Sequence, residues 1–232
     1  MRRKADKTNA HYPIACATAR LAERPIRHSA SPVHAGSRAP KRYNHAMNSR
    51  DLTFIVGGAR SGKSAHAERL AADSGLPVTY IATAATPTGA HADAEFAARI
   101  AHHQARRPAH WGFAAAPLAL AQALDAHAAP GHCVLIDCLT LWLANLLCPP
   151  GSDAPRADWQ ARLDAFAAAC ERAQGTVLVV SNEIGMGVVP MGAATRLYVD
   201  ELGRLNQRIA ALADRATLVA AGLPLVLKAP RA

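Results

Sequence analysis

Residues 57–64 read GGARSGKS, which satisfies the pattern G-x-x-x-x-G-K-[ST]. The pattern follows an apolar run typical of a strand and precedes a stretch typical of a helix, so both halves of its required context are present. Glycines let backbone N–H groups turn toward phosphate oxygens, Lys63 can reach the β and γ phosphates, and Ser64 can bind Mg²⁺. The motif predicts a phosphate-binding loop (P-loop) in an α/β fold, and a plain glycine-rich turn is the alternative.

From Leu52 onward, short β-branched runs alternate with longer amphipathic stretches, which is the pattern of a mostly parallel sheet flanked by helices. We predict strands at 52–57, 78–83, 110–114, 133–138, 176–181, 216–220 and 225–228. We predict helices at 63–73, 93–107, 117–127, 156–173 and 194–213. Gly222 and Pro224 mark a turn, so the last strand is expected to reverse and pair antiparallel at the edge of the sheet.

The positive charge of the chain is concentrated in its first part. Residues 1–46 hold ten Lys or Arg and two acids, whereas residues 47–232 hold sixteen Lys or Arg and fifteen acids. The nearly neutral second part, and a first part without interleaved aromatic residues, argue against a nucleic-acid partner. We predict a single domain over 47–232 and a disordered basic extension over 1–46, for which a transit peptide or a wrongly assigned start codon before Met47 are alternatives.

Composition argues against a largely disordered protein and against a membrane-spanning one. Half of the residues are apolar and 19% are charged, which indicates a globular protein with a sizeable core. The longest apolar run, CVLIDCLTLWLANLL, is shorter than the roughly 20 residues that span a bilayer and contains Asp137 and Asn145, so no membrane span is predicted. Five cysteines without a CxxC pair indicate reduced thiols in a cytoplasmic protein, with one structural disulfide as the alternative.

Polar side chains stand at the ends of two predicted strands. Asp137 closes the apolar run CVLID, the usual place for a Mg²⁺-associated acid in a P-loop protein, although an acid there can also cap a helix. Asn182 and Glu183 follow the strand predicted at 176–181. They would sit beside the phosphate site if their strand neighbours that of the P-loop, and a role as cap or surface residues is the alternative.

The predicted helix 93–107 carries two adjacent histidines that differ in their surroundings. At 100° per residue, His102 shares a narrow charged stripe with Arg99 and Arg106, whereas His103 faces the side that carries the apolar anchors. The arginines could hold phosphates beside the His102 imidazole. A histidine on a polar helix face is more often simply solvated, so these residues alone do not establish catalysis.

Six segments, taken together and in this order, resemble one enzyme family. They are GGARSGKS, YIAT, ARIAHHQARRPAHW, IDCLT, SNEIGMGVVP and GRLNQRIAALAD. Over residues 52–228 the chain is similar to the bifunctional adenosylcobinamide kinase and adenosylcobinamide-phosphate guanylyltransferase family of cobalamin biosynthesis. The resemblance implies a P-loop sheet of mostly parallel strands, with adenosylcobinamide, ATP and GTP as substrates. It also implies a homo-oligomer, a homotrimer in this family, with neither a nucleic-acid partner nor a membrane span.

The resemblance also assigns roles to individual positions. It implies that His102 takes GMP from GTP as a covalent histidine intermediate before the GMP passes to the phosphorylated substrate. The triphosphate cradle matches Gly57, Gly58, Ala59, Arg60, Ser61, Gly62, Lys63 and Ser64. The guanine-nucleotide contacts match Ala82, Thr83, Ala84, His103, Gln104, Ala105, Arg106 and Asp137. Mg²⁺ is expected on the Ser64 hydroxyl, with Asp137 as a second candidate ligand.

The chain departs from the family pattern after the histidine helix. The family commonly reads W-x-T-x-E-x-P there, and this chain has Phe113 and Ala115 at the Thr and Glu positions. A contact that selects guanine is therefore expected to be missing. Two other functions stay open from the residues alone: a monofunctional P-loop metabolite kinase, and a nucleotide-dependent ATPase that binds nucleic acid through its basic extension.

Overall fold

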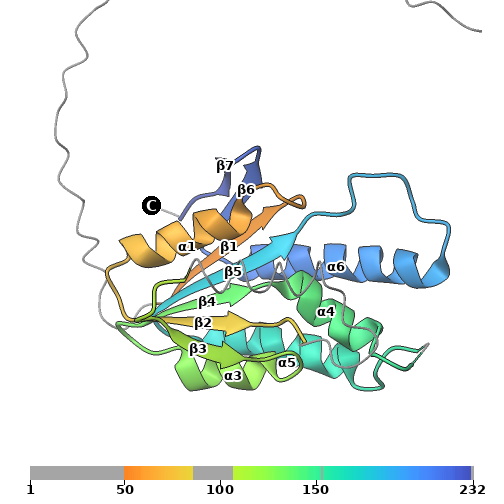
Figure 1. The fold of residues 1–232 in the computed structure, drawn as a ribbon, viewed down its shortest axis with the longest axis horizontal. Coiled ribbons are helices and arrows are strands. Elements are labelled where there is room, and N and C mark those ends of the chain that lie inside the picture. The colour runs from red at the N-terminus through yellow and green to blue at the C-terminus, as the bar shows by residue number, and fades with distance from the viewer. Residues whose placement is uncertain (1–49, 86–106, 153, 231–232) are drawn as a thin grey trace, which may run out of the picture. The chain divides into compact units, whose positions relative to one another are not determined.

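In a computed structural model, which describes residues 50–85, 107–152 and 154–230, seven strands form one sheet (Figure 1). The strands are β1 (Asp51–Gly57), β2 (Val78–Ala82), β3 (Gly112–Ala115), β4 (Cys133–Asp137), β5 (Thr176–Asn182), β6 (Arg215–Ala220) and β7 (Leu223–Lys228). Their order across the sheet is β3-β2-β4-β5-β1-β6-β7. All neighbours pair parallel except β6 and β7, which confirms the predicted fold class and its antiparallel edge.

Five helices accompany these strands in the described part of the chain. They are α1 (Lys63–Asp73), α3 (Leu120–His127), α4 (Leu139–Leu147), α5 (Trp159–Arg172) and α6 (Ala193–Leu212). Four of the predicted helices are confirmed within three residues at each end. The helix predicted at 93–107 lies outside the described residues except for Arg107.

Helix α4 was not predicted from the sequence. Its residues, LTLWLANLL, are apolar on nearly all sides, and both Trp142 and Leu143 are fully buried. Because apolar residues lie on nearly all sides of this helix, its sequence shows no distinct apolar stripe of period 3.6, which is the signal used to recognise surface helices. The predicted strand at 133–138 therefore ends at Asp137, and the chain turns directly into a helix at Leu139.

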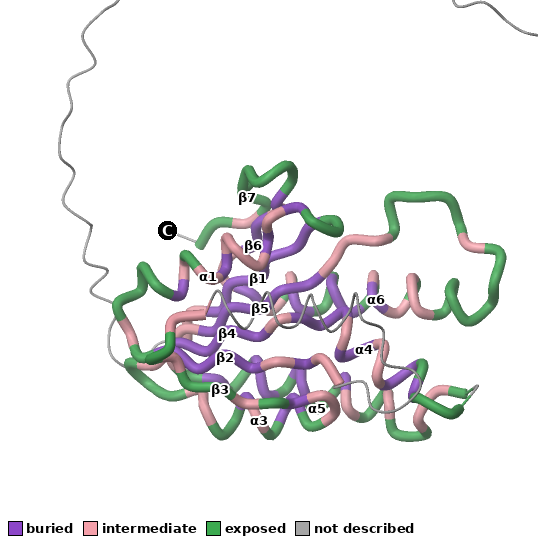
Figure 2. Tube along the Cα trace, viewed as in Figure 1, coloured by how far each residue is buried: buried purple, intermediate pink, exposed green. Residues whose placement is uncertain are grey.

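The helices cover the two faces of the sheet unequally. One face packs Ile55, Leu135 and Val180 against Ala67 and Ala71 of α1. The opposite face carries a larger core, to which α3, α4, α5 and α6 all contribute buried side chains. Figure 2 shows the buried central strands between these layers. Because side chains alternate along a strand, this division fixes the face to which each polar residue at a strand end belongs.

The antiparallel edge has the predicted turn in a slightly different place. Gly222 adopts a positive φ of 80° in the turn between β6 and β7, and β7 already begins at Leu223. Pro224 lies inside β7, opposite Val219. A proline is tolerated there because an edge strand does not need all its N–H groups for pairing.

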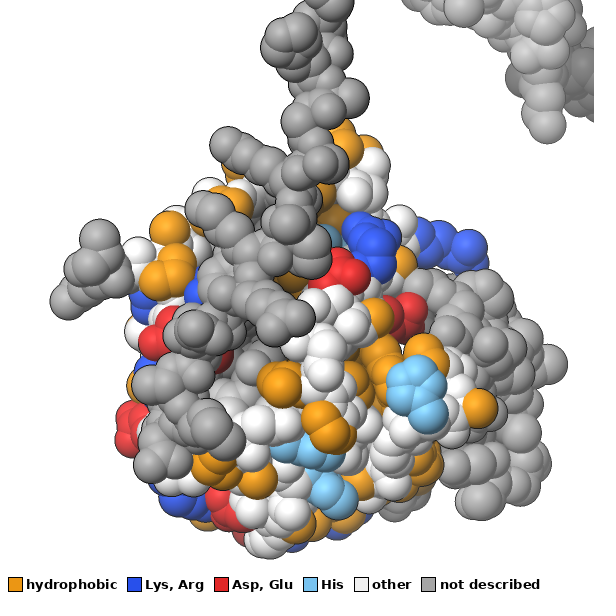
Figure 3. Space-filling view, turned by 90° about the vertical axis from the view of Figure 1, so that its left-hand side faces the viewer, with side chains coloured by type: hydrophobic (Ala, Val, Ile, Leu, Met, Phe, Trp, Pro, Cys, Tyr) orange, Lys and Arg blue, Asp and Glu red, His pale blue; other side chains and the backbone are white. Residues whose placement is uncertain are grey.

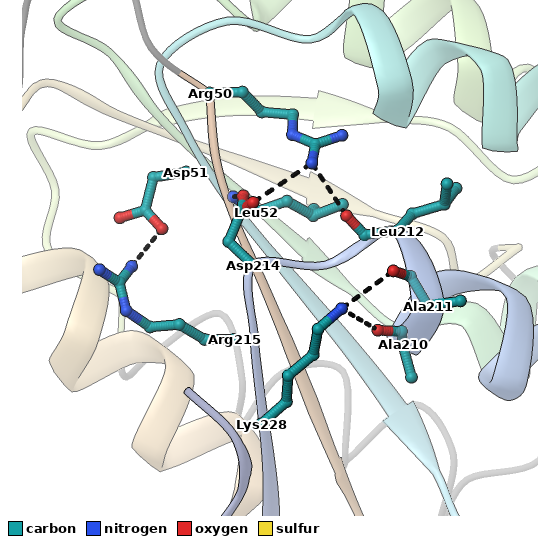
Figure 4. A network of polar contacts seen from close by, with 9 residues as sticks. All are labelled: Arg50, Asp51, Leu52, Ala210, Ala211, Leu212, Asp214, Arg215 and Lys228. Atoms are coloured by element: carbon teal, nitrogen blue, oxygen red, sulfur yellow. Dashed lines mark hydrogen bonds and ion pairs between the residues drawn. The ribbon is translucent and has the colours of Figure 1, made fainter. Parts of the chain in front are cut away.

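Polar contacts join the amino end of β1 to the last turn of α6 and to β6 (Figure 4). Arg50 donates to the carbonyl of Leu212 at 3.0 Å and to Asp214 at 3.3 Å. The other carboxylate oxygen of Asp214 accepts the backbone N–H of Leu52 at 2.8 Å. Charge-assisted bonds of this kind hold the strand start in place and leave the opposite end of β1 for the P-loop.

Charges are dispersed on the face that carries the amino ends of the strands, where acidic and basic side chains lie scattered among apolar and neutral ones (Figure 3). No helix among the described residues is long and apolar enough to cross a membrane.

The four described cysteines, Cys133, Cys138, Cys148 and Cys170, all carry free thiols.

Candidate functional site

The carboxyl end of the sheet brings the predicted polar residues together. Strand β5 lies between β1 and β4, so Asn182 is the register partner of Gly57, the first P-loop residue. The backbone N–H of Glu183 donates to the carbonyl of Gly57 at 3.1 Å. The condition of the prediction, that the two strands are neighbours, is therefore met, and Asn182 and Glu183 lie beside the first residue of the P-loop.

The P-loop uses its glycines for close approach and for a left-handed turn. A Cβ atom on Gly57 would lie 2.4 Å from the carbonyl oxygen of Val219, so no larger residue fits. Gly62 has a φ of +94° and immediately precedes α1, whose first-turn N–H groups have no helical acceptor. Those free N–H groups and the positive end of the helix dipole provide an anion site.

Lys63 is held within this loop. Its side chain is 8% exposed, and its ammonium group donates to the carbonyl of Gly58 at 3.0 Å. Burial lowers the pKa of Lys63 below its ordinary value, and the negative charge of nearby Asp137 opposes that shift. A desolvated ammonium group with one backbone acceptor is well placed to exchange that acceptor for phosphate oxygens.

Asp137 is oriented by a buried tyrosine. Tyr80 is two residues before the end of β2, and its hydroxyl donates to Asp137 at 3.2 Å. Burial, followed by the charge of Asp137, raises the pKa of Tyr80 far above its ordinary value, so the phenol remains a donor at neutral pH. Asp137 shares the α1 face of the sheet with Leu135, and its negative charge acts on Lys63, the first residue of α1. Sequence reasoning missed Tyr80, because a tyrosine within an apolar strand carries no signal of a polar partner.

Phe113, one of the departures from the family pattern, contacts an arginine. The guanidinium carbon of Arg107 lies 4.7 Å from the centroid of the Phe113 ring and 4.4 Å from that of Tyr80. Tyr80 and Phe113 are register partners on β2 and β3, so both rings stand on the same face. Cation–π contact of this kind stabilises a desolvated guanidinium, and a threonine at position 113 would remove one of the two rings.

Thr83, a predicted nucleotide contact between Ala82 and Ala84, is fully buried. Its hydroxyl donates to the carbonyl of Cys138 at 2.7 Å and accepts the N–H of Cys138 at 2.9 Å. Asn145 of α4 donates to the carbonyl of Thr83 at 2.8 Å. The side chain of Thr83 thus joins the ends of β2 and β4, and ties the loop after β2 to the residue that follows Asp137.

We expect Thr83→Val to lower the free energy of unfolding by about 1–3 kcal/mol, because an isosteric side chain without the hydroxyl leaves the buried N–H of Cys138 unpaired and leaves its carbonyl only the N–H of Trp142 as a donor. Urea denaturation followed by circular dichroism measures this loss. Thr83→Ser keeps the hydroxyl and serves as the matched control, which should retain most of the stability. Equal stability of the valine variant and the wild type would show that this contact contributes nothing.

The loop from Glu183 to Gly192 continues from β5 beyond the sheet edge (Figure 1). Glu183 accepts the N–H of Gly185 at 2.7 Å, and Arg196 of α6 donates to the carbonyl of Pro190 at 3.0 Å. Four apolar side chains of this loop are 73–96% exposed: Met186, Val188, Val189 and Met191. Exposed apolar groups gathered on an anchored loop are typical of a surface that binds another molecule.

Several predicted site residues lie outside the described residues. They are His102, His103, Gln104, Ala105 and Arg106. The nucleophilic role of His102 and the guanine-nucleotide contacts of the other four stay predictions. The described residues contain no cluster of three His, Cys, Asp or Glu side chains that could by itself hold a metal ion. Ser64 belongs to α1, Asp137 to β4 and Asn182 to β5, so the candidate oxygen ligands at this edge of the sheet come from separate elements.

Comparison with known proteins gives a consistent result. Residues 53–227 match the family model described as cobinamide kinase / cobinamide phosphate guanyltransferase. The bifunctional adenosylcobalamin biosynthesis protein CobP of Pseudomonas aeruginosa is 52% identical over 179 residues, which cover 77% of this chain and 97% of that protein. The proteins named CobU of Salmonella typhimurium and Escherichia coli are 39% and 38% identical over 186 residues, covering 76% of this chain and 99% of each relative.

Proposed function

Because this chain belongs to the cobinamide kinase / cobinamide phosphate guanylyltransferase family, we propose that it phosphorylates adenosylcobinamide and then transfers GMP from GTP to the product. The carrying observation is a complete P-loop whose lysine and glycines have the required geometry, within a chain that matches the family model over 53–227. The final product would be adenosylcobinamide-GDP, with pyrophosphate released.

In the kinase half of the reaction, the residues of the P-loop would bind and orient the nucleoside triphosphate. The N–H groups at the start of α1 and the ammonium of Lys63 would bind the triphosphate, and Gly57 would allow the backbone to approach it closely. The hydroxyl oxygen of adenosylcobinamide would form a bond to the γ-phosphorus while the bond to the leaving nucleoside diphosphate breaks. The hydroxyl proton would pass to solvent.

The donor set fits Mg²⁺, which prefers oxygen ligands and keeps several waters when it binds nucleotide phosphates. The Ser64 hydroxyl and the Asp137 carboxylate are the residues that we propose to hold it, with Tyr80 orienting Asp137. When bound, the ion would neutralise charge that develops on the phosphate oxygens.

In the guanylyltransferase half, we propose His102 as the nucleophile. Its imidazole nitrogen would form a bond to the α-phosphorus of GTP and expel pyrophosphate. A phosphate oxygen of adenosylcobinamide phosphate would then attack the same phosphorus and release the imidazole. We propose His103, Gln104, Ala105, Arg106, Asp137 and residues Ala82, Thr83 and Ala84 as contacts of the guanine nucleotide. The hydroxyl of Thr83 already has two partners, so its contribution would come through the backbone of this segment.

We further propose a homo-oligomer, a trimer by family resemblance, in the cytoplasm. The exposed apolar side chains of the 183–192 loop and of β7 are surfaces that an assembly could cover (Figure 2). Sedimentation velocity of the purified chain measures the number of subunits.

The test of the whole proposal is turnover of adenosylcobinamide with Mg²⁺ and either ATP or GTP, following the phosphorylated and guanylylated products separately. We expect both products with GTP and a protein-bound label from GTP labelled in its α-phosphate. Phosphorylated product without the guanylylated one, and without labelled protein, would instead identify a monofunctional kinase.

A further inference from the structure

The last residue of β5, Asn182, is fixed through its backbone from two helices. Its N–H donates to the hydroxyl of Thr140 on α4 at 2.9 Å. Its carbonyl accepts the side-chain amide of Asn206 on α6 at 2.9 Å. Asn206 also accepts the hydroxyl of Ser181 at 2.7 Å. The position of Asn182 therefore does not depend on its own side chain.

The side chain of Asn182 belongs to the face of the sheet that carries α1. Leu178 and Val180 of β5 pack in the core beside α1, and Ser181 faces Asn206 on the opposite side. The alternation of a strand then assigns Asn182 to the α1 face. Since Asn182 pairs in register with Gly57, its carboxamide lies at the P-loop on the same face as Asp137 of the neighbouring strand β4.

The amide oxygen of Asn182 is buried and accepts no hydrogen bond within the described part of the chain. A buried acceptor without a donor destabilises the folded protein, so such groups are rare unless a ligand completes them. Phosphate oxygens cannot complete it, because they are acceptors themselves. The partner must bring an O–H or N–H group to the edge of the sheet beside Gly57 of the P-loop.

We infer that the Asn182 amide oxygen is the acceptor for an O–H group of the kinase complex, either the hydroxyl of the alcohol substrate or a water bound to the metal. In both cases the bond would orient that oxygen beside the γ-phosphate. The inference rests on the proposed kinase function, and it assigns to this residue a role in substrate orientation rather than in folding.

The experiment compares Asn182→Ala with Asn206→Ala. Asn182→Ala removes the unpaired oxygen but keeps both backbone hydrogen bonds, so its Tm without ligand should equal or exceed that of the wild type. Its kinase kcat should fall by about tenfold or more, as for loss of one orienting hydrogen bond. Asn206→Ala breaks hydrogen bonds to Ser181 and Asn182 and should lower Tm.

Two further measurements distinguish the sources of the O–H group. If a metal-bound water is the donor, the Tm increase that a non-hydrolysable ATP analogue produces with Mg²⁺ should be smaller in Asn182→Ala. If the alcohol is the donor, that increase is unchanged while KM for adenosylcobinamide rises. A lowered Tm, or an unchanged kcat, would overturn the inference. The ligand-free Tm and the ATP-analogue shift remain informative even if wild-type enzyme does not act on adenosylcobinamide.

Discussion

Lys63→Ala should reduce the kinase kcat by about 100-fold or more, because it removes the positive charge that would contact the β and γ phosphates. The lysine is 8% exposed, and within the described part of the chain its ammonium donates only to the Gly58 carbonyl, so the loss is one of ligand charge rather than of a structural network. Product formation from adenosylcobinamide and ATP measures the effect, and isothermal titration with an ATP analogue should show weakened binding.

Lys228→Ala is the matched control for this substitution. Lys228 donates to the carbonyls of Ala210 and Ala211 at the end of α6, far along the sheet from the P-loop edge. Its loss should leave kinase turnover close to that of the wild type. A Lys63→Ala enzyme with near-normal turnover would contradict the assignment of the P-loop.

His102→Ala should abolish protein labelling by α-labelled GTP and reduce guanylyl transfer by at least about 1,000-fold, as expected for loss of a nucleophile. Much of the kinase reaction should remain, because phosphoryl transfer at a P-loop needs no protein nucleophile. The adduct in the wild type should be labile in acid and stable in alkali, which is the behaviour of a phosphoramidate. Separate assays of the two products on one enzyme preparation make this comparison.

His103→Ala is the control for the neighbouring position. The helical positions predicted for residues 93–107 assign His103 to the apolar side, so its loss should weaken binding or stability and leave the adduct. Label that persists in His102→Ala and disappears in His103→Ala would move the nucleophile by one residue and refute the argument from helix faces.

Local sequence signals were sufficient for the P-loop, the strands and the antiparallel edge. The spacing from Gly57 to Ser64 encodes its own geometry, because the glycines and the helix start act within a few residues of one another. The β-branched runs encode buried parallel strands for the same local reason. Helix α4 was not predicted because apolar residues on nearly all of its sides remove the periodic pattern by which a helix is recognised.

The partners within the site were decided by tertiary structure. The strand order brings β5, not β4, next to the P-loop strand, and so aligns Asn182 with Gly57. It also places Tyr80 against Asp137, 57 positions later in the chain. The spacing of single residues carries no information on such pairs, because strand order depends on how distant helices and strands bury their apolar faces together. The sequence by itself determined which chemical groups stand at the strand ends, and only the tertiary packing decided which of them meet.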